Sequence, residues 1–362
     1  MIGVSRLLDP HGTEFPGDAV RYGHRRPPVP VIVWHITGDC NLMCRHCYAA
    51  LQDTGRARMD RGEALDLIGL LAGLRPPVLL MSGGEPLAHP DFFLYIKEAS
   101  SAGLRVSVST NGVLIGEREA AEMAASGVSY AGVSLDGVGG VNDAFRGVGG
   151  AFRKAVNGIE ALASAGCRVG MRITLARPLL PYLEPLLDLA ISLPVSRVCF
   201  YHFAPVGRGA LDPGLTPCRD DERRAVARII RWADDAARSR SGRTAEILTV
   251  GDASDGVLVY EYLLSRDHAR AEAARDLLAR QASRHAAGIL SVRWDGTLFS
   301  NQFSWDRPLG DWRGLAGLRP QGEAGMFRPA PPSCRASCRW KDICPGNEGR
   351  RCLAAPDGAD AR

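Results

Sequence analysis

Short apolar runs alternate with amphipathic stretches from residue 30 to about residue 210. Each apolar run ends in glycine or polar residues, which is typical of buried strands that lead into turns. The runs are PVIVWHIT, VLLMSGGEP, RVSVSTNG, YAGVSLDG, RVGMRITL and RVCFYHFAP. Stretches of helical periodicity, such as RGEALDLIGLLAGL and AFRKAVNGIEALASAG, separate them. This alternation predicts a parallel sheet with right-handed crossovers, and it places the unusual residues at the carboxyl ends of the strands.

The pattern changes after about residue 210. A charged helical stretch, DDERRAVARIIRWADDAARSR, is followed by AEILTVGDASDGVLVYEYLL and then by ILSVRWDGTLFSNQFS, which predicts a hairpin about Asp295–Gly296. We therefore divide the chain into an N-terminal extension (1–29), a strand–helix core (30–210), a helical connector (211–285) and a cysteine-bearing C-terminal domain (286–362).

Charge and hydropathy argue against several classes of function. A net charge of +4 over 362 residues gives no broad basic face for nucleic acid. No apolar run approaches the length of a membrane span, and the N-terminus MIGVSRLLDPHGTEF lacks the apolar core of a signal peptide. Ten cysteines in such a chain indicate metal or redox chemistry rather than a disulfide framework. We expect a cytoplasmic protein that contacts neither membrane nor nucleic acid.

The stretch CNLMCRHCYAA carries three cysteines, Cys40, Cys44 and Cys47, directly after the first predicted core strand. Thiolates in a short loop suit iron–sulfur clusters or zinc, and a structural zinc site closes with four ligands. A local fourth cysteine is missing, and His46 lies between two of the thiols in sequence. A cubane on three thiolates would leave one iron open. Structural zinc and incidental thiols are the alternatives.

The CxxxCxxC spacing, followed by Tyr48 and preceded by a strand, resembles the radical S-adenosylmethionine (SAM) superfamily. The resemblance implies an α/β fold, a partial (β/α)6 barrel of TIM type. It also implies a [4Fe–4S] cluster whose open iron chelates the amino and carboxylate groups of SAM. Reduction of the cluster would cleave SAM to a 5′-deoxyadenosyl radical. A flavodoxin or ferredoxin is the expected electron donor.

Further segments stand where this family has its SAM-binding turns. By resemblance, GGEP binds the amino group of SAM, with Glu85 accepting from the ammonium, and STNG faces the ribose. Ser134 and Arg146 would hold the SAM carboxylate, and Tyr48 would present its backbone to adenine. Taken singly, each turn has a purely structural alternative. The predicted cofactor-binding residues are Tyr48, Gly83, Gly84, Glu85, Pro86, Ser109, Asn111, Ser134, Asp136, Arg146 and Arg172.

A second cysteine group, Cys334, Cys338, Cys344 and Cys352, follows the predicted barrel. It resembles the SPASM/twitch module of radical SAM enzymes, which carries auxiliary iron–sulfur clusters. Four cysteines suit one auxiliary [4Fe–4S] cluster, so the resemblance implies a small iron–sulfur module at the C-terminus. A structural zinc knuckle is the alternative.

Segments such as VPVIVWHITGDCNLMCRHCYA, FYHFAPVGRGA and CRWKDICPGNEGRR resemble the branch of haem d1 and alternative haem biosynthesis, in which carboxylate-bearing side chains are removed from a siroheme-derived tetrapyrrole. Cys352 stands earlier than that branch usually places its last cysteine. A small carboxylate-bearing substrate is therefore expected. The candidates are such a tetrapyrrole or a sugar or nucleoside uronate of antibiotic biosynthesis. Sugar epimerases or dehydratases and ribosomal-peptide maturases are the alternatives.

Two further residues at late strand ends are predicted to be catalytic. Arg208, flanked by glycines in PVGRGA, suits a bidentate contact with a substrate carboxylate, and a solvated loop arginine is the alternative. His202 could donate a proton, or it could be a hydrogen-bonded core histidine.

Overall fold

The structure is a computed structural model that describes residues 1–23, 29–50, 58–238, 245–283, 288–303, 305–317 and 338–346. Its strands are β1 (Ile2–Gly3), β2 (Val31–His35), β3 (Leu79–Ser82), β4 (Val106–Thr110), β5 (Tyr130–Ser134), β6 (Val169–Leu175), β7 (Arg197–His202), β8 (Glu246–Val250), β9 (Ile289–Val292), β10 (Thr297–Phe299) and β11 (Pro308–Asp311). Its α-helices are α1 (Val4–Leu8), α2 (Asp18–Tyr22), α3 (Arg61–Leu74), α4 (Phe92–Ser101), α5 (Glu117–Ala125), α6 (Gly140–Arg146), α7 (Ala151–Ser164), α8 (Leu183–Ser192), α9 (Arg219–Arg238), α10 (Asp255–Leu264) and α11 (His268–Ser283).

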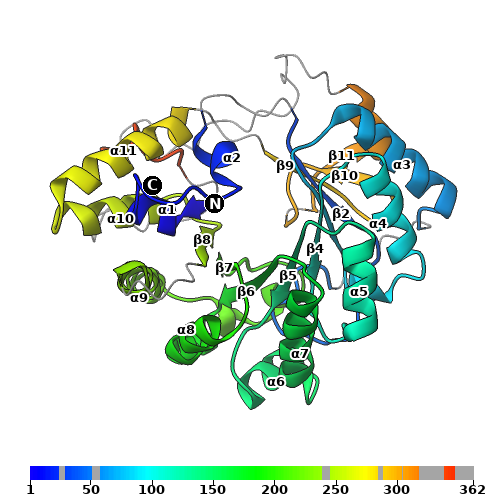
Figure 1. Cartoon of the computed structure of the whole chain (residues 1–362), viewed down its shortest axis with the longest axis horizontal. Coiled ribbons are helices and arrows are strands. Elements are labelled where there is room, and N and C mark those ends of the chain that lie inside the picture. The colour runs from blue at the N-terminus through cyan, green and yellow to red at the C-terminus, as the bar shows by residue number, and fades with distance from the viewer. Residues whose placement is uncertain are drawn as a thin grey trace.

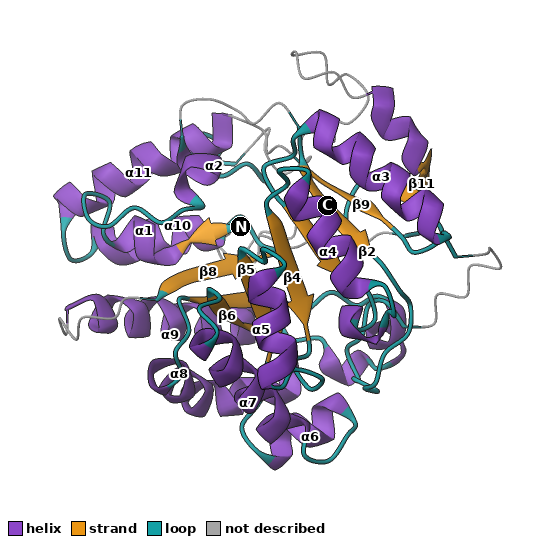
Figure 2. Cartoon of the chain, turned by 45° about the vertical axis from the view of Figure 1, so that its right-hand side comes forward, coloured by secondary structure: helices purple, strands orange, loops and turns teal. Residues whose placement is uncertain are grey.

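Within the described residues, the strands form one sheet in the order β1-β8-β7-β6-β5-β4-β3-β2-β9-β10-β11. Strands β2 to β8 run parallel, each beside the next one along the chain, and β9 adds to β2 in parallel. Helices α3, α4, α5, α7 and α8 lie outside the curved strands, as Figures 1 and 2 show. The arrangement is a partial barrel, so the predicted fold class is confirmed.

The sheet extends beyond the predicted core in both directions. Residues 211–285, predicted to be a helical connector, also contain β8, which is a further parallel strand of the barrel. The hairpin of β9 and β10 forms about Asp295–Gly296 as predicted, with Gly296 at φ +80°. Because β9 pairs with β2, this hairpin continues the barrel sheet instead of starting a separate one.

The helix termini follow from local sequence. At the start of α3, the Asp60 carboxylate accepts from Glu63 N at 2.9 Å, and the Glu63 carboxylate accepts from Asp60 N at 3.2 Å, which makes a capping box. The helix ends where Arg75 adopts the left-handed conformation, just before two prolines. No helix in the described part of the chain is both long and apolar enough to cross a bilayer.

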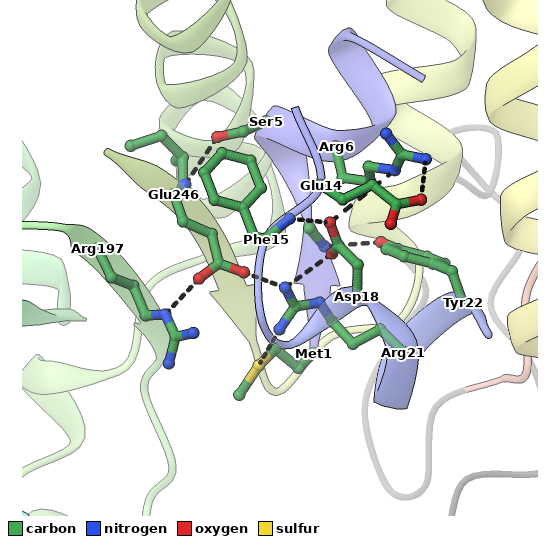
Figure 3. Close-up of polar contacts among 12 residues, drawn as sticks. Met1, Ser5, Arg6, Glu14, Phe15, Asp18, Arg21, Tyr22, Arg197 and Glu246 are labelled. Carbon is green, nitrogen blue, oxygen red and sulfur yellow. Dashed lines mark hydrogen bonds and ion pairs between the residues drawn. The ribbon is translucent and has the colours of Figure 1, made fainter. Parts of the chain in front are cut away.

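The N-terminal extension is joined to the barrel by buried ion pairs (Figure 3). The Glu246 carboxylate, at the start of β8, pairs with Arg197 on β7 and with Arg21 on α2. Arg21 also donates to Asp18 at 2.9 Å. Because these side chains are largely withdrawn from water, removing one partner would leave a buried charge without compensation. The extension therefore belongs to the folded core.

Candidate active site

The cysteine loop, residues 38–48, follows β2 and is held by backbone contacts to two distant segments. Met43 N donates to Arg146 O at 3.1 Å, and Arg208 N donates to Cys47 O at 2.9 Å. Cys40 is exposed, Cys47 is half-buried and Cys44 is buried, and all three thiols are free. Although Cys40 is exposed as a residue, the surrounding protein partly withdraws its thiol from water, which raises the thiol pKa to about 11, and the nearby Glu85, Cys44 and Cys47 add to the shift.

The GGEP turn lies directly against the cysteine loop. Gly84 N donates to Thr37 O and Glu85 N donates to Asp39 O, both at 2.7 Å. A Cβ on Gly83 would come within 2.5 Å of Thr37 O, and one on Gly84 within 2.1 Å of Asp39 O. Gly83 also has φ +150°. The glycines are therefore required for the close approach of this turn to the loop, a role that the sequence interpretation did not include.

Glu85 connects the GGEP turn to the STNG turn after β4. Its fully buried carboxylate accepts from Asn111 N at 2.7 Å and from Thr110 Oγ1 at 2.7 Å. Burial raises the pKa of Glu85 to about 7 against the effect of these hydrogen bonds. The Asn111 amide reaches back to the cysteine loop, where it donates to Asn41 Oδ1 at 2.7 Å. Both oxygens of Glu85 thus have protein donors, whereas the prediction gave this carboxylate an ammonium partner.

Asp136 and Arg146 form a buried pair beside the second cysteine. Arg146 Nη2 lies 2.5 Å from Asp136 Oδ2, and Arg146 Nη1 donates toward Cys44 Sγ at 3.7 Å. His46 Nε2 lies 3.4 Å from the same carboxylate oxygen, and its ring stacks on Phe145. Burial would raise the pKa of Asp136, but Arg146, His46 and the hydrogen bonds from Thr174 together outweigh burial, and the pKa is lowered. The Asp136 carboxylate therefore orients the Arg146 guanidinium beside the Cys44 sulfur.

A cavity opens at the carboxyl ends of the parallel strands. Of the predicted residues, Tyr48, Ser109, Ser134, Arg146, Arg172 and His202 line it. Gly83, Gly84, Glu85, Pro86, Asn111, Asp136 and Arg208 do not appear in its wall. The sequence interpretation did not select the other lining residues, which are His46, Ser82, Thr174, Tyr201, Phe203, Ala204, Gln302 and Phe303. Ser82, Thr174 and Tyr201 lie on strands, where period-two alternation was the available signal because residues that alternate along a strand share one face. The other five lie in loops, where no such pattern exists.

Residues 34–183 match the family model described as the radical SAM superfamily. The chain is 34% identical to Fe-coproporphyrin III synthase of Methanosarcina barkeri, over 96% of this chain and 92% of that protein. The chain belongs to the radical SAM superfamily. It is also 30% identical to pre-heme d1 synthase of Dinoroseobacter shibae, over 91% of this chain and 84% of that protein. The family predicted from the cysteine spacing, and its haem-biosynthesis branch, are confirmed.

Solved structures of other radical SAM proteins share this fold. Streptococcus suis SuiB bound to S-adenosylmethionine superposes with a TM-score of 0.65 at 15% identity, over 88% of this chain and 73% of that one. As a radical SAM enzyme, the chain uses a [4Fe–4S] cluster and SAM.

The cysteine loop fits the cluster of a radical SAM enzyme by its donor chemistry. Three free thiols share one loop, and N–H donors point at two of the sulfurs: Leu42 N at 3.4 Å from Cys40 Sγ, and Arg146 Nη1 at 3.7 Å from Cys44 Sγ. Such donors stabilise thiolates and tune cluster potential. Among the described residues, no three His, Cys, Asp or Glu side chains converge to hold a single metal ion. The fit therefore rests on the thiols and their donors.

Arg208, predicted to bind a substrate carboxylate, contacts the cysteine loop of this radical SAM enzyme. Its Nη1 donates to Cys44 O at 2.7 Å, in addition to the backbone bond to Cys47 O. The preceding Gly207 has φ +57°, and a Cβ there would come within 2.4 Å of Tyr48 O. The glycine thus serves close approach to the loop, so the position of Arg208 at a strand end has a structural explanation.

His202, predicted to be catalytic, is buried at the end of β7 between two carboxylates. Its Nδ1 lies 3.1 Å from Glu222 Oε1, and its Nε2 lies 2.9 Å from Asp255 Oδ2. Burial would lower the pKa of His202, but Asp255 and Glu222 outweigh it and raise the pKa to about 10. The imidazolium is therefore held on both ring nitrogens at neutral pH.

Two of the four tail cysteines lie among the described residues. Cys338 Sγ accepts from Trp340 N, and Cys344 Sγ accepts from Gly346 N, both at 3.4 Å. N–H donors at both sulfurs suit an auxiliary cluster of a radical SAM enzyme. Cys334 and Cys352 lie outside the described residues.

Proposed function

We propose that this radical SAM enzyme removes carboxylate-bearing side chains from a siroheme-derived tetrapyrrole. The proposal is carried by the end-to-end similarity to an enzyme named Fe-coproporphyrin III synthase and is supported by the similarity to one named pre-heme d1 synthase. The relatives named here favour the tetrapyrrole over the sugar or nucleoside uronate.

Cys40, Cys44 and Cys47 would hold the cluster, and Ser134 and Arg146, which line the cavity, would bind the carboxylate of SAM. When bound and reduced, this pair of cofactors supplies a 5′-deoxyadenosyl radical that takes a hydrogen atom from a substrate carbon.

The protein contributes position and exclusion of water. Arg146 is oriented by Asp136 and contacts the Cys44 sulfur, so its charge lies where cluster and SAM would meet. Tyr48 joins the cavity wall from the cysteine loop, and its ring packs edge-on against Phe303 from the C-terminal domain at 5.1 Å between centroids. Loss of a side chain from a substrate radical requires an electron acceptor. An auxiliary cluster on Cys338, Cys344 and their tail neighbours is the candidate.

The test is anaerobic turnover of the reconstituted enzyme with SAM and dithionite. Didecarboxysiroheme, a uronic-acid sugar nucleoside and a precursor peptide are offered separately. We expect 5′-deoxyadenosine to form in step with side-chain loss from the tetrapyrrole only, and not with a variant in which Cys40, Cys44 and Cys47 are alanine. Coupling of 5′-deoxyadenosine to the uronate or to the peptide would overturn the proposal.

A further inference from the structure

Arg172 is a guanidinium inside the barrel that faces the cavity. It lies on β6, and its Nη2 lies 2.5 Å from the Tyr201 hydroxyl oxygen on β7. The guanidinium carbon also stands 4.7 Å from the centre of the Tyr201 ring. Both side chains line the cavity together with Ser134 and Thr174.

Arg172 differs from the largely buried Arg146, Arg197 and Arg293 because no carboxylate pairs with it among the described residues. Arg146 pairs with Asp136, Arg197 with Glu246, and Arg293 with Asp295. A guanidinium cannot discharge itself by losing its proton, and withdrawing it from water without an anion is unfavourable. The side chain therefore has an unused anion-binding capacity.

The surrounding chain makes room for this side chain. Gly132 on β5 lies beside its stem, and a Cβ at that position would come within 2.8 Å of Arg172 Cδ. The glycine lets the stem lie flat, so that the guanidinium reaches Tyr201. Because the Tyr201 oxygen accepts from Arg172, its own O–H is available to donate. A carboxylate in the cavity could accept hydrogen bonds from the Arg172 guanidinium and from the Tyr201 hydroxyl.

We propose that Arg172, with the Tyr201 hydroxyl, binds a carboxylate of the substrate, an inference that rests on the proposed function. The carboxylate of SAM is the other possible source of the same chemistry. Arg146 already stands against the Cys44 sulfur and serves that end of the cavity. Arg172 stands at the β6–β7 side, with Tyr201 as its hydrogen-bond partner. This proposal assigns to Arg172 the substrate contact that the sequence predicted for Arg208.

The binding test uses reconstituted enzyme with SAM and iron(III) coproporphyrin III, followed by the shift of the porphyrin absorption band. Arg172→Gln should weaken porphyrin binding about 10- to 100-fold, as expected for loss of a charge-assisted hydrogen bond. The porphyrin affinity of Arg172→Lys should lie between those of wild type and Arg172→Gln, because the lysine ammonium is a point charge that cannot make the bidentate contact of a guanidinium. Arg118→Gln, on the exposed face of α5, is the matched control. The dissociation constant of SAM, from equilibrium dialysis, should stay unchanged in every variant.

Chemical removal of the charge gives the complementary measurement. The tetramethyl ester of the porphyrin should bind wild-type enzyme about as weakly as the free acid binds Arg172→Gln. The Arg172→Gln variant should bind the acid and the ester with equal affinity. Equal affinity of wild type and Arg172→Gln for the acid would overturn the inference. Weakened SAM binding in Arg172→Gln would assign the site to SAM instead.

A stability measurement separates this inference from the proposed function. In enzyme without porphyrin or SAM, Arg172→Met should melt at a higher temperature than wild type, because it removes an uncompensated charge. Arg293→Met should melt lower, because it leaves the buried Asp295 unpaired. A lowered melting temperature for Arg172→Met would overturn the anion site itself. Wild-type enzyme that binds neither this porphyrin nor didecarboxysiroheme would overturn the proposed substrate, whichever way Arg172→Met melts.

Discussion

The buried His202 makes the stability of the protein depend on pH, and His202→Gln should remove that dependence. The imidazole is fully enclosed and contacts Glu222 in the first turn of α9 and Asp255 at the start of α10. The charged imidazole therefore connects β7 to α9 and α10, two helices that lie outside the predicted core. Glutamine keeps a single donor group near the same position but carries no charge.

The magnitude follows from the pKa. An unfolded histidine titrates near about 6.5, and the two carboxylates hold the pKa of folded His202 at about 10. Because the folded pKa is the higher one, the stabilisation is fully present below the unfolded value and is lost as the pH rises through the folded value. At about 1.4 kcal/mol per pKa unit, the charged contact stabilises the fold by roughly 3 to 5 kcal/mol near neutral pH.

The assay is anaerobic thermal melting of wild type and His202→Gln from pH 6.5 to pH 10. We expect wild type to melt roughly 4 to 7 °C higher at pH 6.5 and this gap to narrow steadily as the pH rises. Asp255→Asn, which removes one of the carboxylates, should lose its stabilisation at a lower pH than wild type. A gap between wild type and His202→Gln that stays constant across this range would show that His202 is not held as a cation.

Three further perturbations test the site. Gly84→Ala should push the GGEP turn off the cysteine loop at a cost of about 1–3 kcal/mol, lowering both melting temperature and iron content, and unchanged values would contradict the close approach. Arg208→Ala should lower iron retention through loss of its bond to Cys44 O while leaving porphyrin affinity unchanged; weakened affinity would restore its predicted substrate role. Replacing Cys338 and Cys344 by alanine should remove about four of about eight irons per chain, whereas loss of zinc alone would favour a structural knuckle.

Sequence patterning predicted the barrel because its strands are buried on both sides and stand out as apolar runs between turns. Strand β8 was not predicted because EILTV is a short apolar run, which periodicity alone cannot distinguish from a buried helix. The two-residue strand β1 carries no pattern at all. It pairs with β8, which lies far away in sequence, and this long-range pairing is contained in no local window.

At the site, the spacing of the cysteines and the order of the turns predicted which segments meet, but the direction of each side chain was not accessible. Glu85 and Arg208 stand at strand ends, as a ligand-binding residue would, yet one joins two turns and the other binds a backbone carbonyl. Arg172 lies in the middle of β6 and faces the cavity. What separates these cases is whether a protein partner lies within reach, and that depends on residues far away in sequence.

The same strands carry the stability of the barrel on one face and its chemistry on the other. On β6, Met171 and Ile173 are buried in the main hydrophobic core, while the intervening Arg172 and the following Thr174 line the cavity. Strand β4 repeats the arrangement, with Val108 in the core and Ser109 in the cavity wall. At the carboxyl ends of the strands, the barrel interior is therefore not filled with apolar side chains. Since the apolar face packs against the helices, polar inward positions can change with substrate while the fold keeps its core.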